Sequence, residues 1–151
     1  FGRKGNGLKF GGAGEHLVVK GFKGVVDDKS RTLTMWIKTS DNAGSIANWG
    51  GAGNGGLWEV ELVNGNLGLR VGGGRLETVQ AINNENWRHI AVVFPSSAET
   101  LSDAVLYLDG VAQPVSPAGN PTISTGDEMD LMIGANSSGN NFAGLLDEIR
   151  L

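Results

Sequence analysis

Residues 57–71 read Leu-Trp-Glu-Val-Glu-Leu-Val-Asn-Gly-Asn-Leu-Gly-Leu-Arg-Val and hold the clearest structural signal in the chain. Asn64-Gly65 stands between two alternating apolar runs, and this dipeptide favours a two-residue turn in which both central residues have positive φ. Because each flanking run has the length and the period of a strand, we expect a β-hairpin over residues 57–71.

Similar runs of β-branched, aromatic and aliphatic residues recur along the whole chain, each bounded by Gly, Asn, Asp or Pro. Such runs are typical of strands, and no stretch of a dozen residues keeps a helical period. We expect strands at residues 8–10, 16–19, 32–39, 45–49, 57–63, 66–71, 76–82, 87–95, 104–109, 130–135 and 142–151.

A second tight turn is expected at Asp109-Gly110, where Leu-Asp-Gly-Val interrupts another apolar run. Prolines at positions 114, 117 and 121 exclude a central strand from the segment that follows, because proline cannot donate to a ladder. We therefore expect a long surface loop up to about Gly126. Antiparallel strands with short turns and no crossover helices predict an all-β sandwich or barrel.

Length and composition agree with one globular domain over residues 1–151, since 40% of the residues are hydrophobic and 19% are charged. The net charge of −4 comes from scattered acids, and the twelve Lys and Arg residues form no stripe, so nucleic acid is not an expected partner. No apolar run is long enough for a membrane helix. Without cysteine there is no disulfide framework or thiolate site.

Several segments resemble the laminin-G-like family, in the branch found as accessory modules of bacterial secreted proteins. The matching segments follow the family's order: Gly7 to Gly12, Glu15 to Val19, Thr32 to Lys38, Asn86 to Phe94, Leu106 to Val111, Leu131 to Gly134 and Phe142 to Leu151. The resemblance implies a two-sheet antiparallel jelly-roll sandwich of the concanavalin A-like kind, with about a dozen strands and with the first and last strands adjacent. Its members bind carbohydrate or protein, often with one calcium ion.

The chain begins at Phe1 and reaches strand-like sequence within a few residues. We expect it to be a segment of a longer or processed secreted protein, covalently linked to neighbouring domains. An export signal would then lie outside it.

The segment Ser45 to Gly56 is the first candidate for a ligand site. Trp49 is followed by glycine-rich sequence without a core-facing period, so its ring is expected at a strand end or loop, partly exposed. A ring beside amides suits a sugar, with Asn48 and Asn54 supplying donors and acceptors. The alternative is a tryptophan folded back over the edge of the sandwich.

The strand at residues 57–63 offers a second candidate. Alternation puts Trp58 on one face, toward the core, and puts Glu59 and Glu61 on the other. Paired carboxylates on one face are typical of glycoside hydrolases. The related glucanases carry a further carboxylate in line, where this chain has Val63, and a solvated or salt-bridged sheet face is the favoured interpretation.

Two arginines follow in the same region. Arg70 alternates away from its apolar neighbours, and Arg75 follows a run of three glycines. The planar guanidinium group suits carboxylate or sulfate, so an acidic polysaccharide is one candidate ligand. The favoured alternative pairs these arginines with Glu59, Glu61 or Glu77.

In three other strands, alternation assigns one set of residues to the core: Leu33, Met35, Ile37, Ile90, Val92, Phe94, Leu106 and Leu108. The opposite face of these strands then carries three large side chains, Trp36, His89 and Tyr107. Such a face is either a platform for sugar rings or a second small core under loops, and the second alternative is favoured.

For metal, the family resemblance implies a structural calcium ion near the first hairpin and the last strand, with Glu15 and Asp147 as ligands. Calcium takes six to eight oxygen ligands, and Gly12 to Glu15 is poor in them. Asp147 has the alternative role of accepting hydrogen bonds from the hairpin backbone. Separately, Asn136-Ser137-Ser138 matches a glycosylation acceptor.

These features predict a non-catalytic carbohydrate-binding module of a secreted polysaccharide-acting enzyme or a surface adhesin, with a glycan as partner and an extracellular or cell-surface location. Trp49, Asn48, Asn54, Arg70, Arg75, Trp36 and Glu59 are the predicted ligand residues. A protein-binding laminin-G-type adhesion domain is the first alternative. A glycoside hydrolase using Glu59 and Glu61 is the second.

Overall fold

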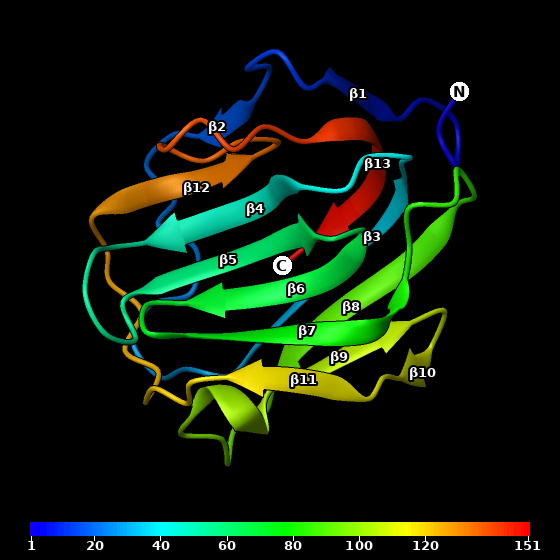
Figure 1. Cartoon of the computed structure of the whole chain (residues 1–151). Coiled ribbons are helices and arrows are strands. Elements are labelled where there is room, and N and C mark those ends of the chain that lie inside the picture. Colours follow the sequence, from blue (N-terminus) through cyan, green and yellow to red (C-terminus); the bar gives the residue numbers. More distant parts are fainter.

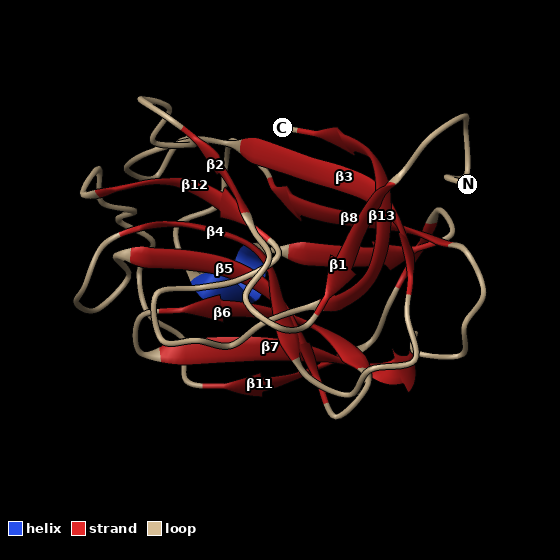
Figure 2. Ribbon diagram, turned by 90° about the horizontal axis from the view of Figure 1, so that it is seen from above, coloured by secondary structure: helices blue, strands red, loops and turns tan.

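Thirteen β-strands form two antiparallel sheets that pack face to face as a jelly-roll sandwich (Figures 1 and 2). The computed structural model describes residues 1–151. The single helix is a 3-10 turn, Leu101–Asp103, so no helix of the structure is long enough to cross a membrane. The expected all-β fold is confirmed.

Sheet A holds six strands, including both ends of the chain. Its order is β1 (Leu8–Gly11), β13 (Ala143–Arg150), β3 (Arg31–Lys38), β8 (Arg88–Phe94), β9 (Val105–Leu108) and β10 (Val111–Ala112). Because β1 pairs with β13, the first and last strands are adjacent, as the family resemblance implies (Figure 2).

Sheet B holds seven strands, and β4 to β7 form its centre (Figure 1). Its order is β11 (Val115–Ala118), β7 (Gly74–Ala81), β6 (Asn66–Val71), β5 (Leu57–Val63), β4 (Gly44–Gly50), β12 (Met129–Ile133) and β2 (Leu17–Val19). All eleven strands expected from sequence are present, with shifts of at most a few residues at their ends.

The two predicted turns are confirmed by their backbone. Asn64 and Gly65 have φ values of 52° and 79°, and Asp109 and Gly110 have values of 49° and 82°. Positive φ at both central residues is the geometry that matches the right-handed twist of the flanking strands. Asn64-Gly65 thereby joins β5 to β6 in register.

The expectation of a long surface loop up to Gly126 is wrong in two places. Residues 115–118 form β11, which pairs with β7 at the edge of sheet B. Pro117 is tolerated there because an edge strand has one side free of ladder hydrogen bonds. Further on, Ile123 and Thr125 are each only 1% exposed, so this segment closes one end of the sandwich.

The core lies between the sheets, and every residue that alternation assigned to it is buried. The predicted core residues, each at most 2% exposed, are Leu33, Met35, Ile37, Trp58, Ile90, Val92, Phe94, Leu106 and Leu108. Side chains at alternate positions of these strands therefore fall on the two outer faces of the sandwich.

Arg31 is a buried cation at one end of this core. Its guanidinium group lies 4.7 Å from the centre of the Trp58 ring and donates to Thr125 Oγ1 and to the backbone carbonyl of Val25. Removal from water disfavours the charged form and lowers the pKa of Arg31 to about 10. Its hydrogen bonds fasten the segment before β3 to the segment before β12.

Candidate ligand-binding site

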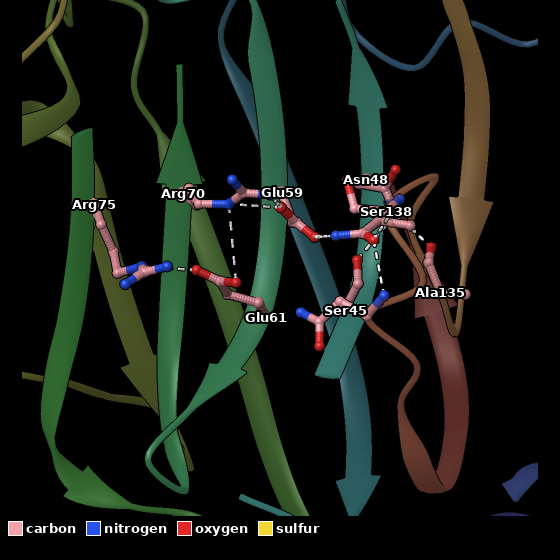
Figure 3. Close-up of polar contacts among 10 residues, drawn as sticks. Ser45, Asn48, Glu59, Glu61, Arg70, Arg75, Ala135 and Ser138 are labelled. Atoms are coloured by element: carbon pink, nitrogen blue, oxygen red, sulfur yellow. Dashed lines mark hydrogen bonds and ion pairs between the residues drawn. The ribbon is translucent and has the colours of Figure 1, made fainter. Parts of the chain in front are cut away.

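A row of side chains, most of them polar, crosses the outer face of sheet B, and its polar members are drawn in Figure 3. Strand register places Met132, Asn48, Glu59, Arg70 and Arg75 opposite one another on β12, β4, β5, β6 and β7. Their sequence neighbours Trp49 and Trp58 face the core, so alternation turns this row outward. We call these five residues the outer-face row.

Glu59 is the buried centre of the row, with 0% of its surface exposed. Arg70 donates to its Oε2 through Nε at 2.8 Å and also through Nη2, while Asn136 Nδ2 donates to its Oε1 at 2.7 Å. Both carboxylate oxygens are therefore engaged, as a buried charge requires. The expected pairing of Arg70 with Glu59 is confirmed.

Glu61 lies two residues along β5 on the same face and is 4% exposed. Arg75 Nε donates to its Oε1 at 2.8 Å, and Arg70 Nε lies 3.9 Å from its Oε2. Burial raises the pKa of Glu61, the charge of Glu59 raises it further, and the two arginines oppose both effects. The sheet face is thus salt-bridged, and its carboxylates are buried, not solvated.

A loop closes over one end of the row. Asn48 Nδ2 donates to Ser45 Oγ at 3.0 Å and to the carbonyl of Ala135 at 2.6 Å, which ties β4 to residues 135–141 (Figure 3). Within this 135–141 loop, Asn136 Oδ1 accepts from the backbone N–H groups of Ser138 and Asn140. Asn136 therefore shapes the loop and attaches it to β5 at once.

Loop and sheet enclose a depression of about 270 Å³, called here the outer-face depression. Its polar lining comes from side chains on three strands and the loop, and three apolar side chains complete it. The lining residues are Asn48, Gly51, Ala52, Leu57, Glu59, Arg70, Met129, Asn136, Ser137 and Ser138. A few directed polar groups beside apolar surface are typical of small-ligand sites.

Three of the predicted ligand residues, Asn48, Glu59 and Arg70, come together in this depression. Arg75 lies next to Arg70 in the row but is not part of the lining. Asn54 is exposed on the loop between β4 and β5, with its Oδ1 against Gly73. Neither residue lines the depression.

The expectation that Trp49 is exposed is wrong. Its side chain is 0% exposed, packs against Trp58 with ring centres 6.1 Å apart, and donates through Nε1 to the carbonyl of Val25 at 2.9 Å. Gly24 lies so close that a Cβ there would be 2.5 Å from the indole ring. The segment before β3 covers the ring, so Trp49 cannot stack on a sugar.

Trp36 lies on the outer face of sheet A, away from the outer-face depression. It forms an edge-to-face pair with His89 at 5.3 Å, and the guanidinium group of Arg3 lies 4.7 Å from its ring centre. Tyr107 lies on β9 and is half-buried. The N-terminal segment therefore covers part of this aromatic face, and the face forms neither a bare platform nor a closed core.

Glu15 and Asp147 do not share a site. Glu15 accepts from the N–H of Ala13 after β1, whereas Asp147 accepts from the N–H of Lys4 before β1, so the two carboxylates lie at opposite ends of that strand. Asp147 does accept backbone hydrogen bonds, but from Lys4 and Glu148 and not from the hairpin after β1, so its alternative role is right in kind and wrong in partner. No three His, Cys, Asp or Glu side chains form a group suited to a metal ion. These two residues therefore do not fit one calcium ion, and calcium binding stays a prediction.

A wider hollow of about 470 Å³ lies where the end of β3 meets the start of β13. Three charged residues, Lys38, Asp41 and Glu85, line it. The one buried polar residue of its lining, Thr39, donates its hydroxyl hydrogen bond to the carbonyl of Ala143 and so does not offer it to a ligand. The outer-face depression, by contrast, exposes atoms of a network fixed by buried groups. We therefore take the smaller depression as the candidate site.

Asn136, Ser137, Ser138 and Met129 were missed as site residues. In the sequence, positions 136–138 match only a glycosylation acceptor, and no periodicity places Asn136 beside Glu59, 77 residues earlier. The weak signal was the polar loop directly after an apolar strand. With its amide bound to Glu59 and to its own loop, Asn136 is fully engaged.

A protein-family match shows which superfamily the chain belongs to. The family model Laminin_G_3, described as the concanavalin A-like lectin/glucanases superfamily, matches residues 11–151. The chain belongs to this superfamily. No curated protein matches it by sequence.

Solved structures of the same fold include laminin G domains, and their low sequence identities support the fold alone. Domains LG4-5 of the mouse laminin α1 chain match with a TM-score of 0.71 and 16% identity, over 97% of this chain and 41% of the laminin chain. A protein from Bacteroides ovatus, provisionally described as carbohydrate-binding, matches with a TM-score of 0.66 and 18% identity. That match covers 95% of this chain and 43% of the other, so this laminin-G-like chain spans less than half of each.

Proposed function

We propose that this laminin-G-like chain is a non-catalytic carbohydrate-binding module whose ligand occupies the outer-face depression. One observation carries the proposal: a fixed set of planar polar groups, from Asn48, Glu59, Arg70 and Asn136, opens into a hollow of about 270 Å³. The amide of Asn48 and the guanidinium group of Arg70, held in fixed orientation by Glu59, match the directional hydroxyls of a sugar.

The other lining residues supply contact area and adaptability. Leu57 and Met129 offer apolar surface to the C–H face of a sugar ring. Ser137 and Ser138 are exposed on the loop and bring hydroxyl groups that rotate to donate or accept. The carbohydrate-binding description of the Bacteroides ovatus neighbour supports the same ligand class.

A site of this size implies modest affinity, which suits a module tethered beside others. Linked sites gain through effective concentration, so weak binding suffices on a polymer with many repeats. We therefore place the module in a secreted polysaccharide-acting enzyme or a surface adhesin, outside the cell or on its surface. Extracellular placement is general among laminin-G-like domains.

A blocked depression tests the proposal. Ser138→Trp puts a large ring into the hollow without removing a buried contact, and Ser97→Trp makes the same change at an exposed serine on the β8–η1 loop. In affinity electrophoresis against neutral and anionic polysaccharides, wild type and Ser97→Trp should be retarded by the same glycan. Ser138→Trp should lose at least 10-fold in affinity.

Two outcomes would count against the module. If no polysaccharide retards the wild type, carbohydrate binding is wrong. If Ser138→Trp binds as well as wild type, the depression is not the site.

A protein-binding role is the alternative that one further observation favours. Leu8, Leu17, Val19 and Phe22, near the β1 and β2 edges of the two sheets, are each 40–43% exposed. Where such residues form one contiguous patch, they are typical of an interaction surface. The double variant Leu17→Ser/Val19→Ser would then lose a purified protein partner that Ser138→Trp retains.

Hydrolysis by Glu59 and Glu61 finds no support in the geometry. A glycosidase needs one carboxylic acid free to protonate the leaving group and a second free to act as nucleophile or base. Here each carboxylate accepts hydrogen bonds from an arginine and is buried. Release of reducing sugar by the isolated chain, lost in Glu59→Gln, would overturn this conclusion.

A further inference from the structure

We infer that the outer-face depression selects uncharged glycans over sulfated or uronate-bearing chains. This inference rests on the proposed function, since it names the class of glycan for the same site. It also argues against the acidic polysaccharide that the sequence offered as a candidate ligand of Arg70 and Arg75.

The two arginines are already neutralised. Arg70 uses Nε and Nη2 on Glu59, and Arg75 uses Nε on Glu61 at 2.8 Å. Both carboxylates are buried, so they stay beside the arginines and are not displaced by a ligand from solvent. An incoming sulfate therefore meets two paired guanidinium groups with carboxylates behind them.

A third carboxylate stands at the rim. A Cβ at Gly51, which lines the depression, would lie 1.9 Å from Glu128 Oε2. The carboxylates of Glu59 and Glu61 balance the guanidinium groups of Arg70 and Arg75, so the row itself carries no net charge. An anionic ligand therefore meets no unpaired cation in the row, and the carboxylate of Glu128 beside Gly51, which is exposed and screened by solvent, adds a weak repulsion.

The groups left free suit hydroxyls. Arg70 Nη1 donates no hydrogen bond within the protein, and Asn48 Oδ1 accepts none although the residue is only 3% exposed (Figure 3). The free donor lies on β6 and the free acceptor on β4, with β5 between them, and each can hold a sugar hydroxyl group, which both donates and accepts. A site that holds hydroxyls in this way rejects analogues that cannot complete the pattern.

Matched polymer pairs test this selectivity with the intact chain. Hydroxyethyl cellulose is compared with carboxymethyl cellulose, dextran with dextran sulfate, and agarose with carrageenan, by affinity electrophoresis at low salt. We expect the neutral member of the bound pair to bind at least 10-fold more tightly. Equal or tighter binding of the anionic member overturns the inference and leaves the proposed function standing.

A variant that adds a charge tests whether the discrimination between neutral and anionic polymers arises at the depression. Ser138→Lys adds a cation at the mouth of the depression, and Ser97→Lys adds one at the control serine. Ser138→Lys should narrow the gap between neutral and anionic members at least threefold, while Ser97→Lys leaves it unchanged. Equal effects of the two variants would show that selectivity arises outside the depression, and binding of no polymer by wild type refutes the proposed function itself.

Discussion

The outer faces of the two sheets differ in what covers them. On sheet B, the 135–141 loop binds Glu59 through Asn136, and the enclosed polar groups form a depression. On sheet A, Arg3 lies over Trp36, which forms an aromatic pair with His89. A conspicuous aromatic face is therefore not the better candidate site, because fixed orientation depends on buried hydrogen bonds.

The largest expected effect comes from breaking the buried pair on sheet B. Glu59→Ala leaves Arg70 and Asn136 without their acceptor. Losing one partner of a buried pair costs several kcal/mol, and since Arg70 is 38% exposed we expect a loss of about 3 kcal/mol in the free energy of unfolding. Urea denaturation measures it.

The matched change on sheet A is Arg150→Ala at the end of β13, which removes the exposed ion pair with Glu148. Exposed pairs contribute little, so the expected loss is below about 0.5 kcal/mol. Equal losses in the two variants would erase the distinction between the two faces.

The next effect concerns the loop. Asn136→Ala removes the hydrogen bond to Glu59 and the two bonds that shape residues 136–140, and we expect a loss of about 2 kcal/mol. Amide hydrogen exchange should accelerate within this loop. Asn54→Ala, at an exposed asparagine, serves as control with a change within about 0.5 kcal/mol. Unchanged exchange in the loop would contradict the role given to Asn136.

A smaller effect is expected on sheet A. Arg3→Ala removes the cation over Trp36, which at an exposed site is worth about 0.5–1 kcal/mol. Lys9→Ala, at an exposed lysine on β1, should cost less. If Arg3→Ala destabilises as much as Asn136→Ala, the N-terminal segment is a true cover and the two faces are alike.

The smallest expected difference is in how folding stability depends on pH, because one carboxyl group on each face changes that stability in the opposite direction. The pKa of Glu61 is raised above its ordinary 4.5 by burial and by Glu59. The folded chain then takes up this proton before the unfolded chain does, so the Glu61 contribution to stability grows as pH falls toward 4.5. The pKa of Asp147, on the outer face of sheet A, is lowered below its ordinary 3.8 by the N–H of Lys4. Its contribution is present above pH 3.8 and is lost as pH falls through the lowered pKa.

Two isosteric variants test these opposite pH dependences of stability. Glu61→Gln should be at least as stable as wild type at pH 7 and lose that advantage below pH 4.5, whereas Asp147→Asn should be less stable at pH 7 and converge with wild type in stronger acid. Thermal midpoints between pH 2.5 and pH 8, on the order of ten points per variant, measure both. The same sign in both variants would contradict the contrast.

Much of the fold could be predicted because its signals are local. Alternation over residues 57–63 was enough to send Trp58 inward and Glu59 outward, and Asn64-Gly65 was enough to turn the chain. The candidate site could be predicted only in part. Asn48, Glu59 and Arg70 were named from sequence, while Asn136 and Ser138 return to them from a distant segment.

Trp49 marks the limit of local reasoning. Its glycine-rich flank looked open in the sequence, yet Val25 and Gly24 fold over the ring from the other side. The sequence by itself determined the strands, the turns between them and which face of each strand points to the core. These features depend only on residues close in the chain, namely the alternation of apolar residues along a strand and the turn residues that accept positive φ. The tertiary structure decided which outward side chains are covered, since that depends on loops which chain order separates and packing brings together.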